Sequence, residues 1–286
     1  MPELKALEVS LDEDLLTLSQ YLWRHGLAHR VIEREGRRML LVKRREQIDV
    51  VRELYARARR GEALPENPAL PVPHNPLLVA LLRFPVTMVL IVLSCIGAVI
   101  GGLQLPIMRL FTFFDYDLIL GRYLVFDLSQ GHYWRLFTPM FLHFSLLHIA
   151  FNMVLLWFWG RKIEVTQSSR RLFAIVMLLA MLSNIAQAIF SGPGRFGGMS
   201  GVDFGLFGYC LAWAWIFPHS ILKVEKPLVI MMFISLVLGF INFSGVLGMG
   251  ATANVAHVSG LIFGVILGLV MAFIAKTGDH KNDRLV

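Results

Sequence analysis

The chain has 286 residues, of which 56% are hydrophobic and only 16% charged, and its formal net charge is +7. Soluble domains average about 25% charged residues, so this composition excludes an ordinary soluble globule, and the high apolar content excludes a disordered chain. Only two cysteines are present, Cys95 and Cys210, which excludes a fold built on disulfides. Both lie in apolar runs, where a free thiol packs like a small hydrophobic side chain, so they say nothing about the redox compartment. The basic residues cluster at the ends of hydrophobic runs, which is typical of membrane proteins and predicts no nucleic-acid partner.

Residues 1–62 predict a small cytoplasmic α+β domain in the order helix, strand, strand, helix. Ser10 and Glu13 have the spacing of a capping box, so the first helix is expected to follow them and to end at Gly26. Alternating runs at 28–33 and 39–43 predict a hairpin, and a second amphipathic helix is expected over 46–60. Five prolines between positions 65 and 76 predict a linker, placed at 63–84.

Six apolar runs follow and predict a bundle of six transmembrane helices over 85–276, with a cytoplasmic tail at 277–286. The runs are 86–104, 146–160, 172–191, 200–217, 228–244 and 254–275. The second is short alone, and we expect it to extend back into 141–144. With the N-terminus inside, 23 of the 27 Lys and Arg residues lie on the cytoplasmic side, so both termini are predicted to be cytoplasmic. The chain begins without the apolar stretch of a cleaved signal peptide.

The first outer loop, residues 105–145, is too long to lack structure and is rich in aromatic side chains. Its three Arg residues are balanced by three Asp residues. This composition predicts a segment that lies in the membrane interface.

Four polar side chains stand within the apolar runs: His148, Asn152, Ser200 and His257. Polar groups in a bilayer are costly, so each suggests a functional site. The predicted topology makes the second, fourth and sixth helices parallel, and all four residues lie in the first two turns of those helices. We therefore expect the four side chains at a similar depth, close to the outer surface.

Small residues predict which helices touch. The fourth helix has Gly201, Gly205 and Gly208, and the sixth has glycines at 260, 264 and 268, a spacing that lets backbones approach closely. Such packing would bring the Ser200 hydroxyl within the ~2.6–3.2 Å of the His257 imidazole that nucleophilic catalysis requires.

Structural explanations for these polar residues stay open at this point. Ser200 could bond to a helix carbonyl, His257 could be a buried structural histidine, and His148 with Asn152 could join helices by hydrogen bonds. Asp203 is the only carboxylate clearly inside an apolar run, and we expect it to face water or the helix N-terminus rather than to act as a third catalytic residue. His143 and His148 are five residues apart without an HExxH glutamate, so no metal site is predicted.

Four motifs in this order resemble those of the rhomboid intramembrane serine proteases. Residues 198–205 (GMSGVDFG) resemble their GxSGxxxG motif, 148–152 (HIAFN) their HxxxN motif and 256–264 (AHVSGLIFG) their AHxxGxxxG motif. The Trp134–Arg135 pair matches one in the family's first loop, and the N-terminal segment is similar to that of the bacterial GlpG-like subgroup. The likeness covers about residues 85–275.

The resemblance implies roles for individual residues. Ser200 would be the nucleophile and His257 the general base, in a dyad that needs no carboxylate, metal or other cofactor. His148, Asn152 and the Ser200 backbone N–H would form the oxyanion site, and Gly198 and Gly201 would support it as parts of the GxSG motif. Relatives often carry a tyrosine stacked on the catalytic histidine, where this chain has Phe204, so the ring is kept and the hydroxyl is lost.

The resemblance further implies a bacterial inner-membrane protein that cleaves transmembrane protein substrates in the lipid bilayer. Two rival functions are a catalytically silent rhomboid-like protein that binds membrane clients, and a transporter that uses the polar cluster for a solute. Intact Ser200 and His257 oppose the first, and the lack of an internal repeat opposes the second. The N-terminal domain is open to three roles: partner binding, homodimer formation or assistance in folding.

Overall fold

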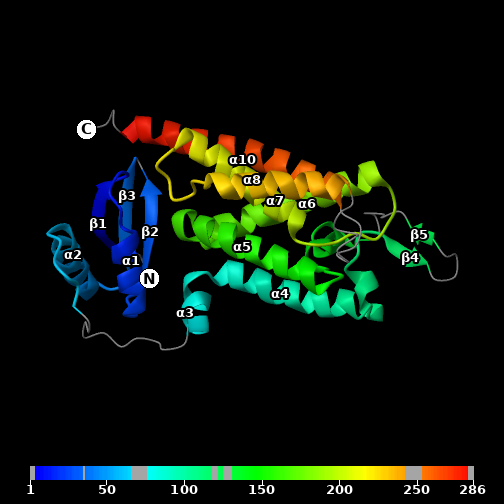
Figure 1. The fold of residues 1–286 in the computed structure, drawn as a ribbon, viewed down its shortest axis with the longest axis horizontal. Helices are drawn as coiled ribbons and strands as arrows, with labels where there is room; N and C mark the ends of the chain where they lie inside the picture. Colours follow the sequence, from blue (N-terminus) through cyan, green and yellow to red (C-terminus); the bar gives the residue numbers. More distant parts are fainter. Residues whose placement is uncertain are drawn as a thin grey trace.

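The structure is a computed structural model that describes residues 4–34, 36–65, 76–117, 122–124, 131–241 and 253–282. A small domain with a β-sheet lies at one end of an elongated helical bundle, and a two-stranded hairpin lies at the opposite end (Figure 1). The chain is therefore mostly helical with a small α+β region at its N-terminus, as the sequence predicts.

The N-terminal domain contains three strands and two helices. In chain order these are β1 (Leu4–Ser10), α1 (Leu16–Arg24), β2 (His29–Arg34), β3 (Arg37–Val42) and α2 (Glu46–Arg59). The sheet is antiparallel with strand order β1-β3-β2, and the predicted hairpin is confirmed as β2 paired with β3. The core of this domain includes Leu22, Leu27, Leu40 and Val51, all essentially inaccessible to solvent.

The predicted order of elements in this domain is wrong, because it omits strand β1. Ala6, Leu7 and Val9 are buried, and β1 pairs with β3 along its length with one register shift. Ser10 is thus the last residue of a strand and not a helix cap. The helix begins six residues later, at Leu16, whose N–H donates to Asp14 Oδ1 at 2.7 Å. An aspartate thus takes the role that the sequence analysis gave to Ser10.

Part of the predicted linker is helical. Helix α3 covers Pro76–Arg83, and helix α4 begins two residues later at Pro85. Proline at the first position of each helix is favoured, because the missing N–H would have no partner there. Residues 66–75 of the predicted linker lie outside the described residues.

Each of the six predicted apolar runs forms a helix. The helices are α4 (Pro85–Gly102), α5 (Leu146–Gln167), α6 (Ser169–Ser191), α7 (Ser200–Ile216), α8 (Lys226–Phe240) and α10 (Asn254–Asn282). By length and composition α4, α6 and residues 254–277 of α10 can each cross a membrane. Helix α8 is apolar but has 15 residues, α7 has 17, and α5 has 22 with charged residues in its last turns. The end of the fifth run, 242–244, lies outside the described residues.

Helix α5 extends toward its C-terminus and not, as expected, back into residues 141–144. It begins at Leu146, and the Ser145 hydroxyl caps it by accepting the His148 N–H at 3.2 Å. At the other end Glu164 is buried, and its carboxylate accepts the N–H groups of Val86 and Thr87 at 2.8 and 2.9 Å and the Thr87 hydroxyl at 2.7 Å. A buried carboxylate that caps the neighbouring helix allows α5 to continue past its apolar run.

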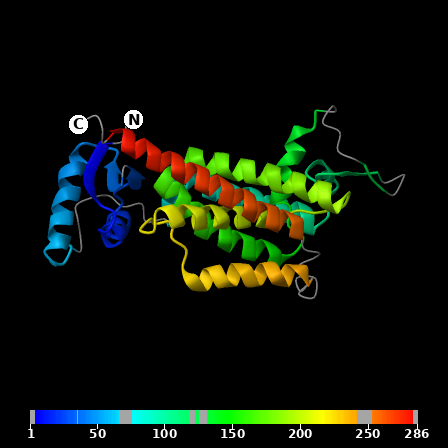
Figure 2. The ribbon, with the colours of Figure 1, turned by 90° about the horizontal axis from the view of Figure 1, so that it is seen from above.

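Helix α7 is the centre of the bundle, and most of its residues are buried. It packs along α10 on one side and also contacts α5 and α6. Helix α8 lies at the edge of the bundle (Figure 2), where only Met232 and Gly239 are buried and several large apolar side chains are exposed.

The 105–145 loop contains several short elements: η1 (Pro106–Leu110), β4 (Asp115–Asp117), β5 (Arg122–Leu124), η3 (Tyr133–Leu136) and η4 (Thr138–Phe141). The Trp134 indole N–H donates to the Leu110 carbonyl at 2.9 Å. The buried Arg135 guanidinium donates to the Thr112 carbonyl, also at 2.9 Å. The tryptophan–arginine pair therefore ties the two ends of this loop together.

Candidate active site

The first turns of α5, α7 and α10 meet at the end of the bundle that bears the β4–β5 hairpin (Figure 1). Ser200 is the first residue of α7, and His257 is the fourth residue of α10. The Ser200 Oγ and His257 Nε2 atoms are 2.7 Å apart, which is a hydrogen bond. Two side chains 57 residues apart in the sequence are thus in the geometry of a nucleophile and its base.

Close packing of α7 on α10 makes this contact. A Cβ atom on Gly260 would lie 2.0 Å from the Gly201 carbonyl oxygen, and one on Gly264 would lie 1.9 Å from the Gly205 carbonyl oxygen. No side chain fits at either position, so only glycine allows the two backbones to approach this closely. The predicted glycine face of the sixth helix is therefore confirmed as the contact with α7.

Two further contacts fix the His257 region. The Phe204 ring lies against the imidazole, with centroids 4.8 Å apart and an interplanar angle of 30°. Gln187 of α6 accepts the Ala256 N–H through Oε1 at 2.9 Å, directly before the histidine. His257 is 9% exposed, and among the described residues its Nδ1 has no hydrogen-bond partner. Within that part of the chain, then, no carboxylate bonds the far side of this ring.

His148 and Asn152 surround the backbone of Gly198, two residues before Ser200. A Cβ atom on Gly198 would lie 2.7 Å from the Cε1 and Nε2 atoms of His148 and 3.4 Å from Asn152 Nδ2. Gly198 also has φ = +119°, which other residues rarely adopt. Its N–H donates to the Pro139 carbonyl at 3.0 Å, so η4 holds the segment that leads into Ser200. Nitrogen donors on α5 thus lie beside the start of α7.

His143 belongs to this site, although the sequence analysis considered it only as a metal ligand. It is fully buried, and its Nδ1 lies 3.0 Å from the Phe141 carbonyl, which requires the proton on Nδ1. Its Nε2 is therefore an acceptor, and it receives an N–H of the Asn152 amide at 3.0 Å and the Met199 N–H at 3.4 Å. One histidine thus orients both the Asn152 amide and the residue before Ser200.

Asp203 does not face water, so that part of the expectation is wrong. The side chain is completely buried, and neither carboxylate oxygen has a hydrogen-bond partner among the described residues. In the helix its neighbours in sequence, Val202 and Phe204, are buried as well. The reason for the error is that α7 is packed between neighbouring helices from Gly201 to Cys210, so the Asp203 position has no face toward solvent.

Several histidines lie close together in this site, which raises the question of metal binding. Across the described ranges, no three His, Cys, Asp or Glu side chains are grouped so that they could hold a metal ion. His143 and His148 contact each other edge to face, with ring centroids 5.0 Å apart. The site is built from a hydroxyl, imidazoles and an amide, which suit acyl transfer to a serine.

Comparisons with known proteins give matches to both parts of the chain. The Rhomboid domain family matches residues 130–273, and the Rhomboid N-terminal domain family matches residues 1–67. Proteins named Rhomboid protease GlpG from Salmonella newport (strain SL254), Salmonella typhi and Salmonella typhimurium are each 39% identical over 149 residues. That stretch is 52% of this chain and 51% of each relative, so the match spans about half the length of these proteins. With half of its residues in the Rhomboid domain, the chain belongs to the rhomboid family.

Proposed function

We propose that this protein is an intramembrane serine endopeptidase that hydrolyses peptide bonds in or near transmembrane segments of other membrane proteins. The observation that carries the proposal is the 2.7 Å contact between Ser200 Oγ and His257 Nε2. Membership of a family whose relatives are named proteases supports it further. The contact lies in the first turn of two membrane-type helices, where a polar pair is otherwise costly.

In the proposed mechanism Ser200 and His257 act as a dyad. Ser200 Oγ attacks the scissile carbonyl carbon, while its proton passes to His257 Nε2. The tetrahedral intermediate collapses, the C–N bond breaks, and the imidazolium gives its proton to the leaving amine. Water, activated by the same imidazole, then attacks the acyl-enzyme, and its collapse returns the proton to Ser200 and releases the acid product.

The oxyanion of the intermediate would be stabilised by His148, Asn152 and the Ser200 backbone N–H. Asn152 keeps one amide hydrogen for this role, because the amide has two and the other goes to His143. The Ser200 N–H lies at the beginning of α7, where backbone donors have no acceptor within the helix. Loss of one such donor typically costs about 2.7–4 kcal/mol of transition-state stabilisation.

Three residues would support the dyad without touching the reacting atoms. Gly198 leaves room for the His148 ring, Gly201 provides the carbonyl against which α10 packs, and Phe204 holds the plane of the His257 ring. For location we propose a bacterial inner membrane with both termini in the cytoplasm. The distribution of basic residues supports this orientation, because it places most of them on that side.

The test is cleavage of a transmembrane substrate in liposomes by the wild type, Ser200→Ala and His257→Ala. We expect cleavage by the wild type alone. Ser259→Ala is the matched control, because this hydroxyl, on the same helix as His257, donates to the helix carbonyls of Val255 and Ala256. A Ser200→Ala protein that still cleaves would overturn the proposal. A folded wild type that cleaves no substrate would favour the silent client-binding function.

A further inference from the structure

The loop between α7 and α8, residues 217–225, joins the two hydrophobic cores of the chain. Leu222 and Val224 are buried in the core of the bundle. Ile221, directly before them, packs against the core of the N-terminal domain. Neighbouring side chains of one short loop thus belong to two different cores. The proposed protease function makes no use of this contact.

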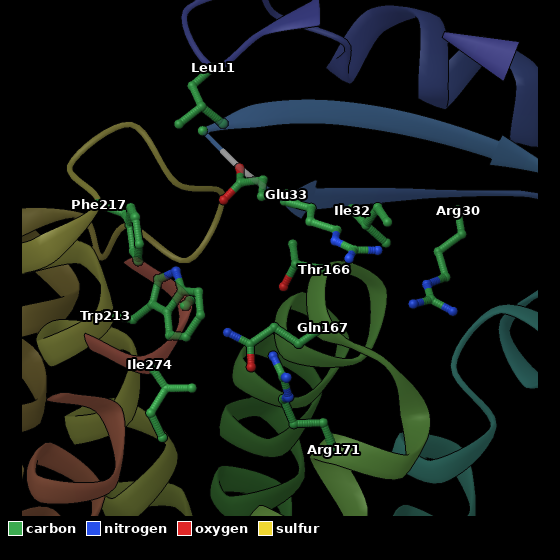
Figure 3. A pocket seen from close by; sticks show the side chains of 13 residues that line it. Leu11, Arg30, Ile32, Glu33, Thr166, Gln167, Arg171, Trp213, Phe217 and Ile274 are labelled. Atoms are coloured by element: carbon green, nitrogen blue, oxygen red, sulfur yellow. The ribbon is translucent and has the colours of Figure 1, made fainter. Parts of the chain in front are cut away.

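Two charged side chains of the β2–β3 hairpin bind the backbone of this loop. The Arg38 guanidinium donates to the His219 carbonyl at 3.2 Å. The Glu33 carboxylate accepts the Ile221 N–H, also at 3.2 Å. Glu33 and Arg38 pair with each other at 3.2 Å, and their side chains are only 12% and 8% exposed. In Figure 3 the Glu33 side chain points toward the loop that follows Phe217. The domain therefore recognises the loop through one backbone acceptor and one backbone donor, both bonded to charged groups.

Elsewhere the contact between the domain and the bundle is loosely packed. Two cavities, of about 350 and 230 Å³, lie between them (Figures 1 and 3). Strand β2 lines both on one side, and the last turn of α5 with the first turn of α6 lines both on the other. Cavities remove van der Waals contacts across an interface, so docking depends on contacts at its edges, such as those of the loop. Domain interfaces of this kind usually allow relative motion.

The position of helix α8 depends on the same loop. Met232 and Gly239 are the buried residues of α8, so few side chains fix it against the bundle. Its far end is held because the Gly239 carbonyl accepts an N–H of the Asn254 side chain at 3.1 Å. Its near end follows directly on the loop, where the Lys162 Nζ donates to the Lys223 carbonyl at 3.1 Å. A helix with so few buried residues takes its position largely from its ends, so the loop determines where α8 starts.

We propose that the N-terminal domain is a reversible clamp on the 217–225 loop, and that its docking restrains the first turns of α8. The partner of the Glu33–Arg38 face is then a segment of the same chain. A ligand of the domain that binds only the docked or only the undocked state would shift the mobility of α8 as well. The clamp involves no residue of the dyad, so it does not rest on the proposed protease function.

The experiment measures amide hydrogen exchange of the full chain in a neutral detergent, on peptides from the loop, from the first turns of α8 and from β3. Ile221→Ala removes the side chain that packs on the domain and changes no residue of the domain itself. Glu33→Ala removes the acceptor of the Ile221 N–H from the other side. In both variants we expect exchange in the loop and in residues 226–232 to be about tenfold faster or more. Loss of most of an isoleucine side chain, or of a hydrogen bond to a charged group, is worth at least that factor.

Each variant has a matched control. Lys223 is exposed and bonds to the bundle through its carbonyl, which Lys223→Ala keeps. Glu53 is exposed and pairs within α2, so Glu53→Ala removes a carboxylate of the same domain away from the loop. Both controls should exchange like the wild type in α8.

Exchange in β3 separates undocking from unfolding of the domain, and it should stay at the wild-type rate in Ile221→Ala. If Glu33→Ala unfolds the domain, α8 must still exchange faster, because an unfolded domain cannot dock. Wild-type exchange in the first turns of α8 in either Ile221→Ala or Glu33→Ala would overturn the proposal. Equal acceleration in Lys223→Ala or Glu53→Ala would overturn it as well.

Discussion

The contact between α7 and α10 predicts the effect of one methyl group next to the dyad. In Gly260→Ala the new Cβ would lie 2.0 Å from the Gly201 carbonyl oxygen, whereas real Cβ atoms are essentially never closer than 3.0 Å to such an atom. This oxygen belongs to the backbone and cannot rotate away. The two helices must therefore move apart by at least 1.0 Å at this point, the difference between these two distances.

This displacement acts on catalysis because Ser200 and His257 are on the two helices that separate. If the shift is transmitted to the dyad, the Oγ–Nε2 distance rises from 2.7 Å to about 3.7 Å, beyond a hydrogen bond. A misplacement of about 1 Å costs about 100-fold in rate. Overpacking in a well-packed core costs about 1–3 kcal/mol of stability as well. We expect activity to fall about 100-fold, with a smaller effect on folding.

The assay is cleavage of a transmembrane substrate in liposomes, together with thermal unfolding of the same samples. Gly102→Ala is the control, since a Cβ on this helix-terminal glycine meets no atom within 4 Å. It should keep full activity. A Gly260→Ala protein with wild-type activity would refute the argument that the glycine contact sets the dyad distance. A Gly260→Ala protein that does not fold at all would refute the expectation that the loss of stability is only about 1–3 kcal/mol.

Three other changes have defined outcomes. Gly198→Ala should lower cleavage by about 10²–10³-fold, the cost of one oxyanion donor, because its Cβ would lie 2.7 Å from the His148 ring and displace it. Arg38→Ala should destabilise the N-terminal domain by about 3 kcal/mol in urea unfolding, because it removes the buried guanidinium and leaves the Glu33 carboxylate, whose side chain is only 12% exposed, without its ion-pair partner. Burial lowers the pKa of His29 to about 4, against about 6.5 when unfolded, so protonation favours unfolding. The stability of this domain should therefore be full above pH 6.5 and decline by about 3 kcal/mol toward pH 4, as hydrogen exchange can measure.

Each of these has its own control. Gly194 lies in the same loop as Gly198, but a Cβ atom on it would meet no atom within 4 Å, so Gly194→Ala should keep wild-type cleavage. An equal loss of cleavage in Gly194→Ala would contradict the clash argument. Arg37→Ala removes an exposed ion pair and should change stability by less than about 1 kcal/mol; parity with Arg38→Ala would contradict the role of burial. His29→Gln should flatten the acid decline, and an unchanged decline would assign it to other groups.

Much of the membrane fold could be predicted because apolar runs translate directly into helices. The glycine spacings likewise predicted the α7–α10 contact, since close backbone approach requires small residues at regular intervals. The start and end of each helix were less predictable. Helix α5 continues through Glu164 because donors on α4, 77 residues earlier, satisfy that carboxylate, and no local pattern contains this information.

Other features were missed because competing local signals pointed elsewhere. Ser10 and Glu13 fit a capping box, and this pattern hid a strand whose alternation of buried residues is broken by a register shift. His143 precedes its partner Asn152 by nine residues, a spacing with no helical meaning, because a turn separates them. Its only sequence signal was a second histidine close to the HxxxN motif.

The carboxylate of Glu164 also has a consequence for how the chain is assembled. The first turn of α4 leaves the ribosome long before Glu164 is synthesised, and its leading N–H groups then have only water or lipid headgroups as partners. They gain the Glu164 oxygens when α5 is inserted antiparallel beside α4. The cap on α4 is therefore complete only after both helices have been made, so the two helices depend on each other as a pair during assembly.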